Sequence, residues 1–348
     1  MTRKELLKKA IAFEPVPRVP VVTMSGATWA LKQAGLSPET LLQQPDAGAQ
    51  VILDTCDRLN VDIVYGGRAI PHIILRAMGG VLNNSRIGLP GEIVKKPLQD
   101  IEEIYNWTPE QVMENLRADK EYQLLLKQTQ IIREKTGEER FVGVGSFGPF
   151  TTAGQIIGVQ ELLTNLFDED YEEDIDALMK FSEEVVYQVI LDFLKAGGNL
   201  IFIAEPVSSG DLISEADFEK WALPHLVNIR NRLENETPYM ILHICGSTKE
   251  RIPALADSGI SVFSLDALDI HEALDLAGGK ITIMGNLNPV RILERKTEQE
   301  VHEQATALCK AAGKNGGFLL APGCDLTPDT TYENIHAMVQ AAFESETI

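Results

Sequence analysis

The sequence predicts an α/β fold, a (β/α)8 TIM barrel formed by a single domain over residues 1–348. Eight short runs rich in apolar and β-branched residues alternate with longer amphipathic segments, and from Leu200 onward each strand–helix unit takes about 20 to 40 residues. Most runs are apolar on both faces, as strands buried in a parallel sheet are. A doubly wound open sheet is the alternative, but no Gly-x-Gly-x-x-Gly follows the first run, which argues against a Rossmann dinucleotide fold.

The expected strands are spread along the whole chain. In order they are Pro20–Met24, Val61–Gly66, Phe141–Ser146, Leu200–Pro206, Tyr239–Gly246, Val262–Ala267, Ile281–Asn286 and Phe318–Gly323. A wider gap separates the second run from the third. Its Gly79-Gly80 and Gly88-Leu89-Pro90-Gly91 stretches indicate turns, so we expect an inserted hairpin or lid after the second strand.

Amphipathic helices are expected between the strands. Asp174–Lys195 carries apolar residues three and four positions apart, which places them on one face of a helix. Ser214 begins another helix, since a serine followed by an acidic first turn is typical of a helix start. Several helical patterns end at glycines, among them Gly197, Gly278 and Gly313, as glycine is favoured just after a helix.

Composition excludes several classes of partner and location. The 31 Lys and Arg residues against 51 Asp and Glu residues give a formal net charge of −20, which argues against nucleic acid and against an anionic membrane surface. The four cysteines are too few for a disulfide scaffold. No apolar run approaches the ~20 residues that span a bilayer, and the first ten residues lack the apolar core of a signal peptide. We therefore expect a cytoplasmic protein with reduced thiols.

The carboxyl ends of the strands carry the residues that suggest chemistry, because barrel active sites lie at that end. His243 and Cys245 are two apart on one predicted strand, so their side chains share a face, and Cys324 follows the eighth strand. Two thiolates and one imidazole suit Zn²⁺, and three protein ligands leave a position open, as in catalytic zinc sites. The alternative is an ordinary core strand, in which cysteine is among the most buried residues.

Other polar residues near the strand ends are candidates for catalysis or binding. Glu205 ends the fourth strand inside an apolar run, where a buried carboxylate needs a partner, so Glu205, water or the substrate could complete a metal site. Asp266 and Asn286, at neighbouring strand ends, are candidates for proton handling or acceptor binding. Arg68 could hold an anionic substrate tail, and His72, in the predicted lid region, could contact substrate. Ordinary solvated or capping roles stay open for these residues.

Two motifs, His243-Ile244-Cys245-Gly246 and Leu320-Ala321-Pro322-Gly323-Cys324, resemble the uroporphyrinogen decarboxylase superfamily. Within it they are most similar to the methylcobamide:coenzyme M methyltransferase branch. The resemblance runs nearly end to end and includes Glu205-Pro206-Val207-Ser208-Ser209 and Gly285-Asn286-Leu287-Asn288-Pro289. The Asn-Leu-Asn-Pro element is shared across the superfamily, whereas His-x-Cys with a late Pro-Gly-Cys marks the methyltransferase branch.

This resemblance implies a barrel that holds Zn²⁺ through His243, Cys245 and Cys324. It also implies that the metal binds a thiol substrate as a thiolate, which attacks the methyl group of a methylated corrinoid, methylcobalamin carried by a partner protein. Cobalt leaves as Co(I), so the protein mainly activates and aligns the nucleophile. The methyl acceptor could be coenzyme M, another thiol or tetrahydrofolate, and the protein could be a monomer or a homodimer.

The sequence departs from the decarboxylase branch where that branch grips its substrate. The segment Thr23-Met24-Ser25-Gly26-Ala27-Thr28-Trp29 has no arginine to hold the carboxylates of a tetrapyrrole. The second strand ends in Val64-Tyr65-Gly66-Gly67-Arg68, where decarboxylases carry an aspartate. A metal-free decarboxylase is therefore the second hypothesis, and a non-catalytic corrinoid-binding protein is the third.

Overall fold

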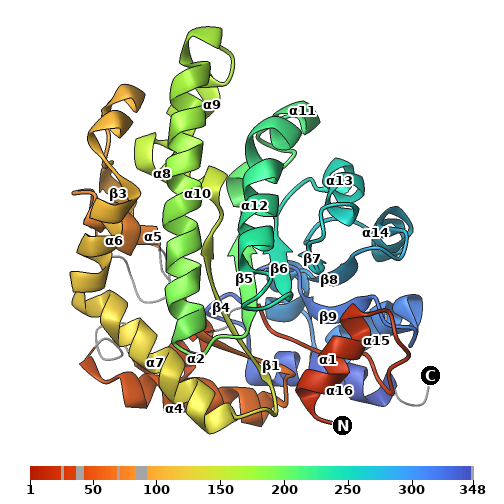
Figure 1. Ribbon diagram of the computed structural model, residues 1–348. Coiled ribbons are helices and arrows are strands. Elements are labelled where there is room, and N and C mark those ends of the chain that lie inside the picture. Colours follow the sequence, from red (N-terminus) through yellow and green to blue (C-terminus); the bar gives the residue numbers. More distant parts are fainter. Residues whose placement is uncertain (25–26, 37–42, 69–70, 84–91, 346–348) are drawn as a thin grey trace.

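A computed structural model describes residues 1–24, 27–36, 43–68, 71–83 and 92–345 of the chain. Its main sheet has seven parallel strands in the order β1–β4–β5–β6–β7–β8–β9, so each strand pairs with the next main-sheet strand along the chain (Figure 1). The strands are β1 (Ile63–Arg68), β4 (Phe141–Phe147), β5 (Leu200–Ala204), β6 (Met240–His243), β7 (Val262–Ser264), β8 (Thr282–Leu287) and β9 (Phe318–Pro322). The predicted α/β class with a parallel sheet is confirmed, and these strands correspond to the second to eighth predicted runs.

Helices surround the curled sheet (Figure 1). They are α1 (Arg3–Ile11), α2 (Ala27–Gln33), α4 (Pro45–Leu59), α5 (Pro71–Ala77), α6 (Pro109–Ala118), α7 (Lys120–Thr136), α8 (Pro149–Ile157), α9 (Val159–Asn165), α10 (Glu172–Lys195), α11 (Glu215–Asp217), α12 (Leu223–Leu233), α13 (Ile252–Ala256), α14 (Ile270–Ala277), α15 (Glu298–Ala312) and α16 (Tyr332–Glu344). The helix predicted over Asp174–Lys195 is α10, and the Ser214 side chain accepts from the Asp217 N–H as the predicted N-cap of α11. Gly278 ends α14 in the left-handed conformation that glycine favours.

Two separate groups of buried apolar side chains show how the sheet is arranged. The larger group lies between the strands and the helices and includes Ile201, Leu242 and Val189 of α10. The smaller group comes from alternate positions of the strands, such as Phe202 and Ile241, and fills the inside of the curl. Since side chains alternate between the faces of a strand, one face of each strand packs on helices and the other packs against the opposite strands.

The first predicted strand, Pro20–Met24, is wrong as a full strand, because only Val21 forms a β-bridge, with Leu320 of β9. Pro20 has no N–H to donate, and the Val21 N–H goes to the Asp62 carboxylate at 2.8 Å rather than to a neighbouring backbone. The segment still lies between β9 and the start of β1, since Val22 N donates to Leu320 O and Asp62 N donates to Val21 O, each at 2.9 Å. A complete eight-stranded barrel stays a prediction.

A two-stranded antiparallel sheet, β2 (Val81–Asn83) and β3 (Glu92–Lys95), occupies the region where a hairpin was expected. The predicted turn at residues 88–91 lies outside the described residues. The action of this hairpin as a lid therefore remains a prediction. Among the described residues, no helix has both the length and the apolar character needed to cross a membrane.

Candidate functional site

His243 and Cys245 lie at the end of β6, and Cys324 lies two residues beyond β9. The His243 imidazole is 3% exposed and sits inside the curl of the sheet, where its ring stacks with Phe202 at 6.5 Å between centroids. Its Nδ1 is 3.1 Å from the Ser264 hydroxyl of β7, while its buried Nε2 has no hydrogen-bond partner among the described residues. The strand alternation used in the sequence prediction thus places His243 on the inner face.

The thiols of Cys245 and Cys324 lie next to each other, although the two residues are far apart in the sequence. The Cys324 thiol hydrogen-bonds to Cys245, and this contact lowers the pKa of Cys245, with burial partly opposing it. The same hydrogen bond, together with burial, raises the pKa of Cys324, which also contacts His243. The structure therefore brings together the three side chains that the sequence predicts as metal ligands.

The donor set fits a soft divalent metal in its chemistry. In the described part of the chain, no group of three or more His, Cys, Asp or Glu side chains is arranged so that it could hold a metal ion as it stands. The buried Nε2 atom without a partner is nevertheless the kind of polar atom that a bound group satisfies. One imidazole with two thiols matches the ligands that zinc favours.

Asp266 lies beside this group. Its carboxylate accepts from the Gly246 N–H at 2.9 Å, and burial raises its pKa, with the nearby His243 partly offsetting that rise. Asn286 lies on the neighbouring strand end, but its amide donates to the Leu268 carbonyl at 2.6 Å, so it holds the loop after β7. The structure brings Asp266 to the predicted ligands and gives Asn286 a backbone partner.

Glu205 follows β5 and is fully buried, as the sequence predicts. Its carboxylate accepts from the backbone N–H groups of Phe150 and Thr151 in the first turn of α8. Carboxylates are favourable at this end of a helix because unpaired N–H groups point outward there. Burial raises the pKa of Glu205 to about 7, and these hydrogen bonds partly oppose the rise. The partner that the buried carboxylate needs is thus a helix N-terminus.

The remaining two predicted residues lie on and just after β1. Arg68 is the last residue of β1, and its side chain lies outside the described part of the structure. His72 is in α5, where its Nε2 is 2.9 Å from the Glu121 carboxylate of α7. Its contact with substrate stays a prediction.

Ser264, Met24 and Asp211 also contribute to the site, and the sequence analysis did not propose them as site residues. Ser264 contacts both His243 and Met24, and Asp211 accepts from the Ser247 N–H at 3.1 Å beside Cys245. The alternation of β7 could have placed Ser264 on the inner face, since it is two residues before Asp266. Nothing local to Asp211 signals that its loop folds onto the end of β6.

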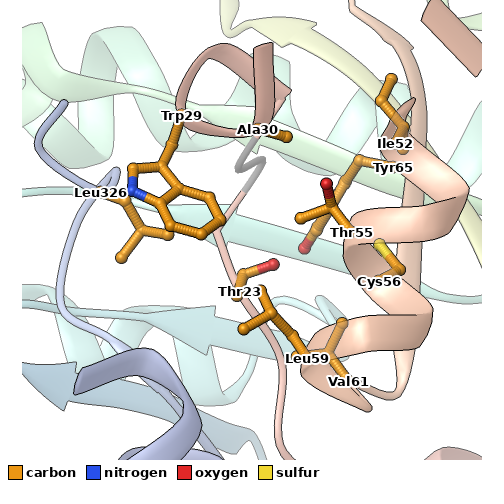
Figure 2. A pocket seen from close by; sticks show the side chains of 10 residues that line it. All are labelled: Thr23, Trp29, Ala30, Ile52, Thr55, Cys56, Leu59, Val61, Tyr65 and Leu326. Atoms are coloured by element: carbon orange, nitrogen blue, oxygen red, sulfur yellow. The ribbon is translucent and has the colours of Figure 1, made fainter. Parts of the chain in front are cut away.

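A separate small pocket lies outside this group of residues. Figure 2 shows Trp29 of α2 facing Thr55 and Cys56 of α4 across a hollow that Thr23 and Tyr65 also line. None of the predicted site residues lines it. Burial raises the pKa of the Cys56 thiol to about 12, so this thiol is protonated at neutral pH.

The protein has a curled parallel sheet, and its sulfur and imidazole side chains lie at the carboxyl ends of the strands. This is the position that active sites occupy in α/β barrels. The sequence matches uroporphyrinogen decarboxylase (URO-D) over residues 2–345, so the chain belongs to the uroporphyrinogen decarboxylase family.

The chain is similar both to proteins named as methyltransferases and to proteins named as decarboxylases. It is 29% identical to the methylcobamide:CoM methyltransferase MtbA of Methanosarcina acetivorans, with 98% of this chain and 97% of that protein covered. It is 27% identical to the uroporphyrinogen decarboxylase of Trichlorobacter lovleyi, with 94% of each covered. Among solved structures, a methyltransferase from Methanosarcina mazei has a TM-score of 0.86 at 22% identity over 99% of each chain, which supports the fold.

Proposed function

We propose that this protein is a zinc-dependent methyltransferase that moves a methyl group between a corrinoid on a partner protein and a thiol acceptor. The observation that carries the proposal is the meeting of His243, Cys245 and Cys324, with a buried Nε2 atom that lacks a partner. The family also contains decarboxylases, but a decarboxylase of a tetrapyrrole has no use for this soft donor set. Methylcobamide and CoM in the names of similar proteins favour a corrinoid donor and a thiol acceptor.

His243, Cys245 and Cys324 would hold the zinc ion. When bound, zinc supplies a Lewis acid that keeps a substrate thiol deprotonated at neutral pH. Apolar side chains of the inner face lie against two of these residues, since Phe202 stacks with His243 and the partly buried Cys324 packs against the inner apolar group. The transfer would form a sulfur–carbon bond as the cobalt–carbon bond breaks, and the electron pair of the cobalt–carbon bond would stay on cobalt.

The residues around the ligands orient them. Asp266 holds the Gly246 N–H and so fixes the turn directly after Cys245. We propose that its second carboxylate oxygen takes part in acceptor binding or proton handling. Glu205 supports the site by holding the start of α8 beside β5. Arg68, Asn286 and His72 remain candidates for substrate binding.

Metal content tests the proposal. We expect about one zinc per chain in the wild type, measured by mass spectrometry, and much less in Cys324→Ala. The matched control is Cys309→Ala, which removes a thiol buried in α15 and should keep its zinc. Zinc-loaded protein should then demethylate methylcobalamin with coenzyme M or another thiol, which is followed by the change in the corrinoid spectrum.

Each negative result points to a different function. Equal zinc in the wild type and Cys324→Ala would contradict the proposed ligand set. Demethylation with tetrahydrofolate but not with thiols would change the acceptor. Corrinoid binding without turnover would support the non-catalytic hypothesis. Decarboxylase activity that survives both chelation and Cys324→Ala would support the metal-free decarboxylase.

A further inference from the structure

Three buried side chains form a short row on the inner face of the sheet. The Met24 thioether sulfur is 3.4 Å from the Ser264 hydroxyl oxygen, which is 3.1 Å from His243 Nδ1. Their residues are 3%, 0% and 3% exposed, so water does not compete for these contacts. The other ring nitrogen, Nε2, has no hydrogen-bond partner in the described parts of the chain.

Counting protons along this row gives one arrangement in which both contacts are hydrogen bonds. A serine hydroxyl has one proton to donate and a thioether sulfur can only accept, so the Ser264–Met24 contact is a hydrogen bond only when this proton points to Met24 Sδ. The same oxygen can then only accept from His243, so Nδ1 carries the ring proton. A neutral imidazole has a single N–H, which leaves Nε2 with a free lone pair.

The opposite tautomer is less favourable on two counts. It would bury an Nε2–H donor without an acceptor, which costs roughly 1–3 kcal/mol. It would also turn the Ser264 proton toward Nδ1 and away from Met24.

We propose that Met24 and Ser264 are positioning residues that fix His243 in the Nδ1–H tautomer, with the Nε2 lone pair free to bind a soft metal ion. The tautomer itself stands on the contacts above. Its role in metal binding rests on the proposed function. Outer residues of this kind set the tautomer and orientation of histidine ligands at metal sites.

The first test reads the tautomer in metal-free protein by nitrogen NMR of ¹⁵N-histidine at about pH 8, above the ordinary pKa of histidine. The chain has six histidines, and the His243 signals are assigned by their loss in His243→Gln. We expect a protonated Nδ1 and a bare Nε2 in the wild type. Met24→Leu keeps the volume but removes the acceptor sulfur, so the signals should shift toward the Nε2–H tautomer.

The second test measures zinc affinity by competition with a chromophoric chelator. Ser264→Ala should weaken zinc binding about 10- to 100-fold, and Ser264→Thr, which keeps the hydroxyl, should recover most of it. The control is Ser182→Ala in α10, another fully buried serine, whose hydroxyl has no hydrogen-bond partner among the described residues. It should leave zinc affinity unchanged.

The two tests separate this inference from the proposed function. A protonated Nε2 in the wild type, or a tautomer unchanged in both Ser264→Ala and Met24→Leu, overturns the inference. Zinc affinity that is equal in the wild type and Ser264→Ala overturns the metal-binding role. The expected tautomer in a protein that binds no zinc at all supports the tautomer and contradicts the proposed function alone.

Discussion

Glu205 places a carboxyl group in the interior, and its titration is coupled to folding. Burial raises its pKa from an ordinary value near 4.5 to about 7. The folded protein therefore binds this proton more tightly than the unfolded chain does. The stability that the protonated group contributes is fully present below about pH 4.5 and is lost as the pH rises through about 7.

Replacing Glu205 by Gln removes this titration and keeps the shape of the side chain. We expect the free energy of unfolding of the wild type, relative to that of Glu205→Gln, to fall by roughly 3 kcal/mol as the pH rises over that range. Urea unfolding at a series of pH values measures it. Parallel pH profiles for the two proteins would show that the carboxyl group titrates normally.

Glu300 provides a control of opposite sign. Hydrogen bonds from Lys296 and Thr297 at the start of α15 lower its pKa to about 2. Its contribution is therefore present above the ordinary pKa near 4.5 and is lost as the pH falls toward 2. Glu300→Gln should change the profile only in this acid range.

At the level of single residues, the proposed metal ligands could be predicted from the sequence, and the residues that contact them only in part. His243, Cys245 and Cys324 follow from strand alternation and from the rule that barrel sites lie at strand ends. Strand alternation could have placed Ser264 on the inner face, but its contact with Met24 joins segments 240 positions apart, which no local sequence pattern indicates.

At the level of elements, hydrogen bonds join the loop after β5 to the loop after β6. Gly210 N donates to Ser247 O at 2.8 Å, and Ser247 N donates to the Asp211 carboxylate at 3.1 Å. The buried Arg251 guanidinium donates to Ile213 O at 2.6 Å. These bonds fix the turn that directly follows Cys245, because Gly246 lies inside it with a φ of 75°.

Gly246→Ala tests how tightly this turn is packed. An added Cβ would lie 2.1 Å from Asp211 Oδ2, so the loop must shift as well as adopt a strained conformation. We expect a loss of about 1–3 kcal/mol in the free energy of unfolding and weaker zinc binding, measured by urea unfolding and chelator competition.

Gly278→Ala is the matched control at the end of α14. Its φ of 56° is also left-handed, but no heavy atom lies within 4 Å of the added Cβ. It should cost about 1 kcal/mol and leave zinc binding intact. The same zinc affinity in both variants would mean that the turn after Cys245 does not position the ligand.

The elements themselves were largely predictable from hydrophobic pattern, and the exception has a local cause. Seven of the eight predicted runs are strands of the main sheet. The first run fails as a strand because Pro20 lacks an N–H and because Asp62, distant in sequence, takes the N–H of Val21. A run of apolar and β-branched residues indicates a buried segment, but it does not indicate which group accepts a hydrogen bond from each backbone N–H.

At the scale of the whole molecule, Asp62 joins the two edges of the sheet. It is fully buried just before β1 and accepts from the Val21 N–H, which lies beside β9. Arg18 donates to both of its oxygens, at 2.6 and 2.8 Å, and Arg3 of α1 donates at 3.2 Å. One carboxylate thus holds the N-terminal segment between β9 and β1.

Asp62→Asn should therefore destabilise the entire fold. The amide keeps the size of the side chain but leaves the buried Arg18 guanidinium without its charge partner, which for a buried pair costs about 3–5 kcal/mol. The control is Asp57→Asn, since the side chain of Asp57 is 66% exposed and its ion pair with Arg140 should be worth less than about 1 kcal/mol. Urea unfolding of both variants measures the difference. Equal losses would mean that backbone bonds alone hold the N-terminal segment between β9 and β1, and a much larger loss in Asp62→Asn would show that its position there depends on this buried charge.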